Sequence, residues 1–340
     1  MWASSAARTL AAFLKAGRPP LKRGSAQKIQ TASRSPLLLS VAKSTKARAS
    51  PKPGTGVWSS GVAMGTAGAR RYSLYRPPGL QPKEQLPMIV MLHGCGQDAR
   101  AFAASTRMNQ IAARERFVVL YPEQDRLANR HGCWNWFATQ SGRAYDEAAL
   151  VMAAVEQVCV LHSVDRNRVA VAGLSAGASM AALMATRYPE RFKAVVMHSG
   201  IPPGTANSAL TAMRAMQGRR ETEPLQAAPA KGTAALPPLL VIHGTIDTVV
   251  DVRNGRAAAQ VWAEAGGARA SAERSVQRGR RFAMKITDFR RNGRTVATLA
   301  DIERLGHAWS GGAGKEPFSN AQGPDASRMV WAFASKQFRR

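Results

Sequence analysis

The chain has 340 residues, of which 45% are hydrophobic and 20% charged, the composition of an ordinary globular protein with a sizeable core. Its formal net charge is +27, and residues 1–83 hold 15 Lys and Arg but no Asp or Glu. No aromatic-and-basic recognition pattern accompanies this charge, so we expect no specific nucleic-acid binding. Three cysteines are too few for a disulfide framework, and no apolar run reaches the roughly 18 residues of a membrane span.

The first part of the chain differs in composition from the rest. Residues 1–56 are rich in Ala, Ser, Lys, Arg and Pro and lack hydrophobic periodicity, so we expect a largely disordered segment. We expect a solvated basic tail there, with an anionic surface as the alternative partner. No clear signal peptide is present, which favours a cytoplasmic location. The predicted folded domain is 57–340.

Within that domain, apolar runs alternate with helical patterns. This alternation predicts an α/β fold, with a mostly parallel sheet covered by helices on both faces. The long Pro- and Ala-rich connection 201–237 is expected to be a loop or lid. The expected strands are 71–76, 87–94, 117–122, 169–172, 193–198 and 238–244, with a hairpin of 282–290 and 295–302 around Asn292-Gly293. The expected helices are 99–114, 146–162, 253–265 and 324–338.

The organising motif is Gly173-Leu-Ser-Ala-Gly177, which stands between an apolar strand and an Ala- and Met-rich helical run. In this context Gly-x-Ser-x-Gly is typical of a nucleophile elbow, a sharp turn that exposes a strained serine at the top of the sheet. Side chains at the two glycine positions would collide with the neighbouring strand and helix. Ser175 is therefore the candidate nucleophile, and the amide of Ala176 at the helix N-terminus is a candidate oxyanion donor.

A serine nucleophile needs a base that removes its proton. Three histidines follow Ser175 in the chain. His198 and His243 come too early to follow an acid in the α/β-hydrolase order of serine, acid and histidine. His307 lies in a Gly-bounded loop after the second hairpin strand, so it is the candidate base.

The base in turn needs a carboxylate that orients and stabilises it. Asp247 comes just after the strand 238–244 and is the candidate acid. Asp251 is the alternative, although it is equally suited to cap the following helix.

A second oxyanion donor is expected in the loop after the first apolar strand. This loop reads His93-Gly-Cys-Gly96, and glycines on both sides of Cys95 let its backbone approach a substrate. The amide of Cys95 is therefore the candidate donor. Cys133 could lie beside Cys95 or pair with it, and the sequence leaves this open.

Aromatic residues gather in loops expected at the same edge of the sheet. Trp134 and Trp136 lie in the loop 131–137, and Trp309 follows His307. Tryptophans in such loops could form the wall of a substrate pocket, or they could simply pack the loops.

Together these motifs resemble the polyhydroxybutyrate depolymerase-type esterases, a family related to feruloyl and acetylxylan esterases. The resemblance spans roughly residues 57–338 and implies an α/β-hydrolase fold that hydrolyses carboxylic esters without a cofactor or metal. It also implies a secreted protein, and it assigns Ser175, Asp247 and His307 as the triad and Cys95 to the oxyanion hole. The motifs are His93-Gly-Cys-Gly-Gln97, Cys133-Trp-Asn-Trp-Phe137, Gly173-Leu-Ser-Ala-Gly-Ala178, His243-Gly-x-x-Asp247 and Gly306-His-Ala-Trp-Ser-Gly-Gly312.

We therefore expect a serine esterase that acts on hydroxyalkanoate oligomers or polyester, or on short-chain esters. The alternative within this class is an esterase that removes feruloyl or acetyl groups from plant polysaccharide. The alternative from another class is a non-catalytic binder that uses the basic segment. Soluble oligomers are expected to be better substrates than crystalline polymer, because a charged tail gives no attraction to an uncharged apolar surface.

Overall fold

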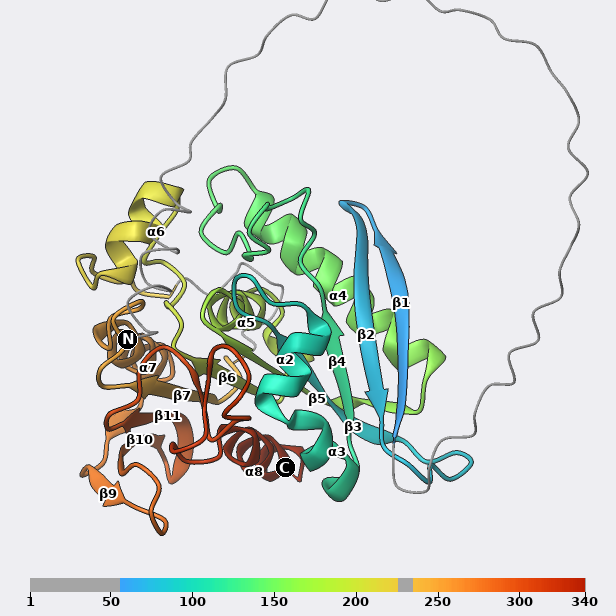
Figure 1. The fold of residues 1–340 in the computed structure, drawn as a ribbon. Helices are drawn as coiled ribbons and strands as arrows, with labels where there is room; N and C mark the ends of the chain where they lie inside the picture. The colour runs from blue at the N-terminus through green and yellow to red at the C-terminus, as the bar shows by residue number, and fades with distance from the viewer. Residues whose placement is uncertain (1–55, 226–234, 340) are drawn as a thin grey trace, which may run out of the picture.

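The computed structural model describes residues 56–225 and 235–339 (Figure 1). The segment predicted to be disordered, apart from Gly56, lies outside these residues, as does 226–234 of the long connection. No helix in the two described ranges is long and apolar enough to cross a membrane.

One large sheet of 11 strands organises the described part of the chain. Its order is β1-β2-β4-β3-β5-β6-β7-β11-β10-β8, and β9 also pairs with β10. Pairs from β4 through β3, β5, β6 and β7 to β11 are parallel, while the remaining pairs are antiparallel. The strands are β1 (Val57–Gly65), β2 (Gly68–Arg76), β3 (Leu86–Leu92), β4 (Val118–Pro122), β5 (Val164–Leu174), β6 (Ala194–His198), β7 (Leu239–Gly244), β8 (Arg269–Ala270), β9 (Arg274–Val276), β10 (Met284–Arg291) and β11 (Arg294–Ile302).

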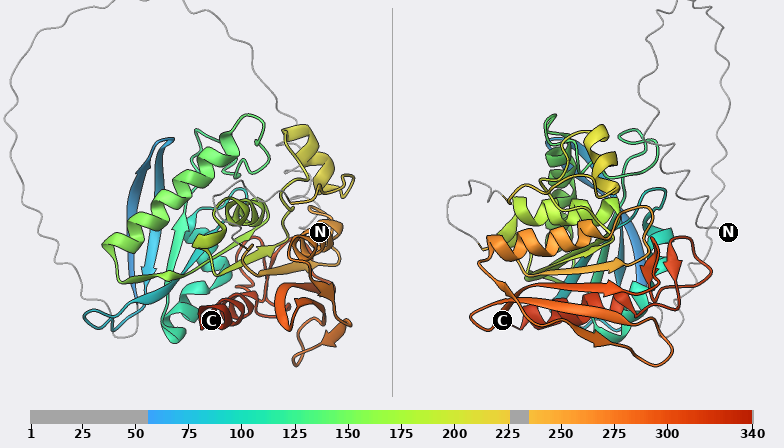
Figure 2. Two further views of the ribbon diagram at one scale, coloured as in Figure 1. Left: turned by 180° about the vertical axis from the view of Figure 1, so that it is seen from behind. Right: turned by 90° about the vertical axis from the view of Figure 1, so that its left-hand side faces the viewer.

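Helices cover the sheet on both faces, as the views in Figure 2 show. Helices α4, α5 and α7 pack on one face, and α2, α3 and α8 pack on the other. Because both faces are covered, the central strands are apolar throughout, and every residue of β3, β4 and β6 is buried. The helices are α2 (Ala99–Thr106), α3 (Met108–Glu115), α4 (Arg143–Leu161), α5 (Ala176–Arg187), α6 (Ala209–Met216), α7 (Arg253–Ala265) and α8 (Ala326–Phe338).

Several elements differ from the sequence-based expectation, among them β1, β8 and β9, which no expected strand covers. The single helix predicted over 99–114 is two helices, because Arg107 takes a left-handed conformation (φ 55°) and ends α2. Its guanidinium donates to the carbonyl of Gly311, a contact with a distant loop. The connection predicted to be a loop contains α6, which begins at a capping box formed by Ser208 and Thr211.

Candidate active site

Ser175 occupies the turn between β5 and α5 in a conformation that side chains rarely adopt, with φ 57° and ψ −123°. Such a backbone costs on the order of 1–3 kcal/mol and persists only where its surroundings enforce it. The two flanking glycines are part of those surroundings. A Cβ at Gly173 would lie 2.3 Å from the backbone of Gly177, and a Cβ at Gly177 would lie 2.1 Å from the carbonyl oxygen of Leu92. The steric role expected for both glycines is therefore confirmed.

The candidate triad residues lie in segments that follow the carboxyl ends of strands, at one edge of the sheet. Ser175 follows β5, Asp247 follows β7, and His307 lies beyond β11. Because β5, β6, β7 and β11 are parallel neighbours, their carboxyl ends meet at this edge, where α/β proteins place their ligands. The register pairs at the edge are Leu174 with His198, His198 with Ile242, and Gly244 with Ile302.

Asp247 and His307 are in direct contact. Nδ1 of His307 lies 2.8 Å from Oδ2 of Asp247, and the other carboxylate oxygen accepts hydrogen bonds from the amides of Val249 and Val250, each at 2.9 Å. Burial alone would raise the pKa of Asp247, but the charge and hydrogen bond of His307 oppose it and lower the pKa to about 2. A carboxylate only accepts hydrogen bonds, so His307 Nδ1 donates and its Nε2 is left to take a proton.

The alternative acid has a different environment. Asp251 forms an ion pair with Arg253, in which Oδ2 lies 2.9 Å from a guanidinium nitrogen. Its other oxygen accepts from the backbone amide of the same arginine at 2.9 Å. The carboxylate of Asp251 is thus engaged near the start of α7, whereas that of Asp247 faces His307.

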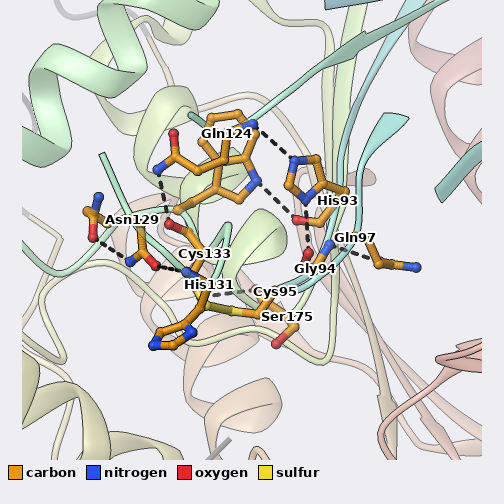
Figure 3. The surroundings of a disulfide bond; sticks show 12 residues. His93, Gly94, Cys95, Gln97, Gln124, Asn129, His131, Cys133 and Ser175 are labelled. Atoms are coloured by element: carbon orange, nitrogen blue, oxygen red, sulfur yellow. Dashed lines mark hydrogen bonds between the residues drawn. A yellow bond between two sulfur atoms is a disulfide. The ribbon is translucent and has the colours of Figure 1, made fainter. Parts of the chain in front are cut away.

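The loop after β3 lies beside Ser175 and is held by a disulfide between Cys95 and Cys133 (Figure 3). The sequence left this pairing open. The amide of Gly96 also donates to the carbonyl of His131 at 2.9 Å, and Nε1 of Trp134 donates to the carbonyl of His93 at 3.0 Å, so hydrogen bonds join the loop to the aromatic segment beside the disulfide. Within the described residues, the amides of Cys95 and Ala176 donate no hydrogen bond, which leaves both available to an oxyanion.

A cavity of about 90 Å³ opens beside Ser175. Most of its wall is apolar. Trp134 and Trp136 contribute to it from the loop that holds Cys133, and α6 contributes Ala212 and Met216. The remaining lining residues are Cys95, Asn129, His131, Cys133, Phe137, Ser175, Ala176, Ser179, Ile201 and Val250.

Trp309 has a different position from the one expected. It is fully buried and does not line this cavity. Its ring stacks on His198 with centroids 5.1 Å apart, it meets Phe102 edge to face at 5.6 Å, and its Nε1 donates to Ser327. Trp309 lies in β12 (Trp309–Ser310), which pairs with β13 (Ser319–Asn320), and its ring belongs to the core on the face of the sheet that α2, α3 and α8 cover.

Glu147 on α4 holds the aromatic segment in place, and no sequence motif pointed to it. Its side chain is buried. Its oxygens accept from the backbone amide and side chain of Asn135, at 2.9 and 2.5 Å, and from Gln124 at 2.8 Å. Asn135 lies between the two pocket tryptophans, so this carboxylate fixes the wall of the cavity. Only tertiary contacts distinguish it from other helical glutamates.

Three buried histidines lie at the carboxyl ends of parallel strands: His93 directly after β3, His198 as the last residue of β6, and His243 as the next to last residue of β7. His93 and His198 accept backbone hydrogen bonds at Nε2 from Gln124 and Ser310, each at 3.1 Å, and His243 contacts the carbonyl of Val250. Burial lowers the pKa of His93 to about 4 and that of His198 to about 3, and it also lowers the pKa of His243. All three are therefore neutral at pH 7.

No group of three or more His, Cys, Asp and Glu in the described ranges is placed to hold a metal ion. The arrangement instead combines a strained serine, a histidine–carboxylate pair and two available amides beside an apolar cavity. These are the parts that acyl transfer needs.

Residues 70–280 match the protein family described as esterase PHB depolymerase. The chain belongs to this family. It is 34% identical over 175 residues to poly(3-hydroxyalkanoate) depolymerase C of Paucimonas lemoignei, a match that covers 49% of this chain and 42% of the depolymerase. It is 28% identical over 205 residues to feruloyl esterase B of Neurospora crassa, covering 56% of this chain and 68% of that esterase. The chain thus matches less than half the length of the depolymerase.

Two solved structures share the fold. Acetyl xylan esterase from Aspergillus awamori superposes with a TM-score of 0.58 at 20% identity, covering 73% of this chain and 94% of that protein. A ferulic acid esterase superposes with a TM-score of 0.53 at 15% identity, covering 84% of this chain and 99% of that protein. The family resemblance and the α/β-hydrolase fold expected from the sequence are both confirmed.

We predict that Asp247→Asn loses most ester hydrolysis and that Asp251→Asn keeps nearly all of it. The amide would present the wrong partner to His307 Nδ1, and a comparable change in a serine protease lowers kcat by about 10⁴. Steady-state kinetics on a p-nitrophenyl ester measures both variants. The opposite ranking would move the acid to Asp251.

We also predict that the free energy of unfolding falls as the pH drops from about 6.5 towards 4. The folded-state pKa values of His93, His198 and His243 lie below the unfolded value of 6.5. Their contribution is therefore fully present above pH 6.5 and is lost as the unfolded state gains protons, with a slope of at most about 1.4 kcal/mol per pH unit for each histidine. Urea unfolding at pH 7, 6 and 5 measures it. Equal stability at all three values would contradict the buried neutral histidines.

Proposed function

We propose that this chain is a serine carboxylic ester hydrolase. The observation that carries the proposal is the hydrogen bond between His307 and Asp247 at the sheet edge where Ser175 stands in its strained turn. Membership in a family of esterases supports the same activity. A protein that only binds a partner has no use for this combination, so the non-catalytic alternative explains the site less well.

In the proposed reaction, Oγ of Ser175 attacks the carbonyl carbon of the ester while Nε2 of His307 takes its proton. The carbonyl oxygen becomes an oxyanion, which the amides of Cys95 and Ala176 stabilise. His307 then passes its proton to the departing alcohol, and an acyl group remains on the serine. Water, activated by the same histidine, releases the acid. Asp247 stays ionised throughout and stabilises the imidazolium.

The cavity favours a short aliphatic acyl group. At about 90 Å³ it is smaller than the roughly 150 Å³ cavity that holds a benzene molecule in an engineered protein. An acetyl or hydroxybutyryl group fits this space better than an aromatic feruloyl group does. We therefore propose short-chain esters and soluble hydroxyalkanoate oligomers as substrates, with feruloyl esters as the alternative that the feruloyl esterase relatives suggest.

A hydrolysis panel of p-nitrophenyl acetate, butyrate and octanoate, hydroxybutyrate oligomers and methyl ferulate tests this proposal. We expect kcat/KM to be highest for acyl groups of two to four carbons and at least about tenfold lower for octanoate and ferulate, since each misfitting methylene costs about 1–3 kcal/mol. Ser175→Ala should lower kcat by about 10⁴ or more on every substrate. A Ser175→Ala protein with a tenth of wild-type activity would contradict the mechanism.

Two variants of α6 serve as a matched pair for the acyl site. Met216 lines the cavity and Met213 does not. Met216→Ala should therefore shift the preference towards octanoate, while Met213→Ala should leave the ranking of substrates unchanged. Equal effects of the two changes would show that α6 does not bound the acyl site.

A further inference from the structure

His243 is buried at the end of β7, directly before the turn that carries the proposed acid. It is the residue before Gly244 at the end of β7, and its side chain is fully inaccessible to solvent. Its Nε2 lies 2.9 Å from the carbonyl oxygen of Val250 and 3.5 Å from Oδ2 of Asp247. The imidazole thus joins the beginning of the turn 244–250 to its end.

The contacts of the ring determine where its proton lies. A carbonyl oxygen only accepts hydrogen bonds, so Nε2 of His243 donates to Val250. Nδ1 is buried and has no partner among the described residues. A proton on Nδ1 would therefore be an unsatisfied buried donor, which is costly. His243 is consequently neutral, with its hydrogen on Nε2.

The backbone of α7 fixes the ring from the other side. A Cβ on Gly255 would lie 2.6 Å from Nδ1 of His243 and 3.0 Å from its Cβ. Only a glycine lets the helix approach so closely, and the ring has no room to turn. The donor nitrogen therefore stays directed at the turn.

Val250 is held at both of its backbone groups. Its amide donates to Oδ1 of Asp247 at 2.9 Å, and its carbonyl accepts from His243. The carboxylate is thereby oriented so that Oδ2 meets His307 at 2.8 Å. If the carbonyl of Val250 were released, the amide on the same residue would be free to move away from the carboxylate.

We infer that His243 is a positioning residue for the proposed acid. It keeps the turn 244–250 closed around Asp247 and so aims the carboxylate at His307. It does not touch the substrate or take a proton during the reaction. The inference rests on the proposed function, because it assigns His243 a role only if Asp247 serves as the acid.

Two substitutions at this position distinguish the effect of losing the hydrogen-bond donor from the effect of losing the imidazole ring. His243→Leu removes the hydrogen bond to Val250, whereas His243→Gln keeps an amide donor close to the place of Nε2. We expect His243→Leu to lower kcat about 10- to 100-fold with KM changed less than about threefold, since small misplacements of catalytic groups cost this much. If His243→Leu lowers kcat 100-fold, the kcat of His243→Gln should be at least tenfold higher than that of His243→Leu. The downfield proton resonance of the His307–Asp247 hydrogen bond should be lost in His243→Leu and kept in His243→Gln.

A control variant distinguishes a loss of activity caused by a misplaced Asp247 from one caused by lower stability of the protein. Val158→Ala removes buried apolar volume from α4 outside the site, and it should lower the melting temperature without changing kcat or the downfield resonance. Equal losses of kcat in Val158→Ala and His243→Leu would reduce the role of His243 to stability. A His243→Leu protein with wild-type kcat would overturn the inference alone, provided that Asp247→Asn is still inactive. If Asp247→Asn is fully active, Asp247 is not the acid and the inference has no basis, whereas an active Ser175→Ala would end the proposed function itself.

A measurement on the unaltered protein does not depend on whether the variants fold. In ¹⁵N-histidine NMR of the full chain at pH 7, His243 should be a neutral imidazole with its hydrogen on Nε2. Assignment with His243→Gln, or by through-bond correlation if that variant does not fold, identifies its signals. A neutral ring with the hydrogen on Nδ1, or an imidazolium, would overturn the inference.

Discussion

The turn between β5 and α5 can form only because two backbones come into contact with no side chain between them. Gly177 lies so close to the carbonyl of Leu92 that a methyl group there would overlap it, and Gly173 lies equally close to the first turn of α5. This contact brings the end of β3 next to Ser175. It therefore places the loop with Cys95 and the helix N-terminus with Ala176 on the same side of the serine. The oxyanion donors and the nucleophile are positioned by one packing constraint.

Buried histidines extend this constraint along the edge of the sheet. His93, His198 and His243 stand near the ends of β3, β6 and β7, and each bonds the backbone of a loop that enters the site. His93 and His198 accept at Nε2 and so carry their hydrogen on Nδ1, whereas His243 donates from Nε2. Burial keeps all three neutral, because an imidazolium would lack water around its charge. His93 and His198 thus each fix a loop that follows another strand, and His243 fixes the turn after its own strand, while His307 is left to transfer protons.

Sequence patterns predicted those parts of the molecule that depend on local rules. The apolar runs of the central strands, the hairpin at Asn292-Gly293 and the bounds of α7 follow from periodicity and turn chemistry. Ser175 could be predicted as the nucleophile because a side chain at either flanking glycine would collide with the neighbouring strand or helix.

Features that depend on contacts between distant segments escaped prediction. Arg107 ends α2 in a left-handed conformation while it bonds the Gly311 loop, and Trp309 packs in the core instead of the pocket. Glu147 does not differ in sequence pattern from other helical glutamates, and only its hydrogen bond from Asn135 shows its role. The disulfide of Cys95 likewise depends on how the fold brings two loops together.

The central claim is that the strained turn and the histidine–carboxylate pair activate one serine. A fluorophosphonate probe reacts with such a serine and leaves a stable adduct that mass spectrometry can locate. Treatment of the full chain at pH 7.5 should give a single adduct on the peptide that contains Ser175, formed far more slowly in Asp247→Asn. An adduct on a different residue, or labelling of Ser175 at the same rate in both proteins, would contradict the account.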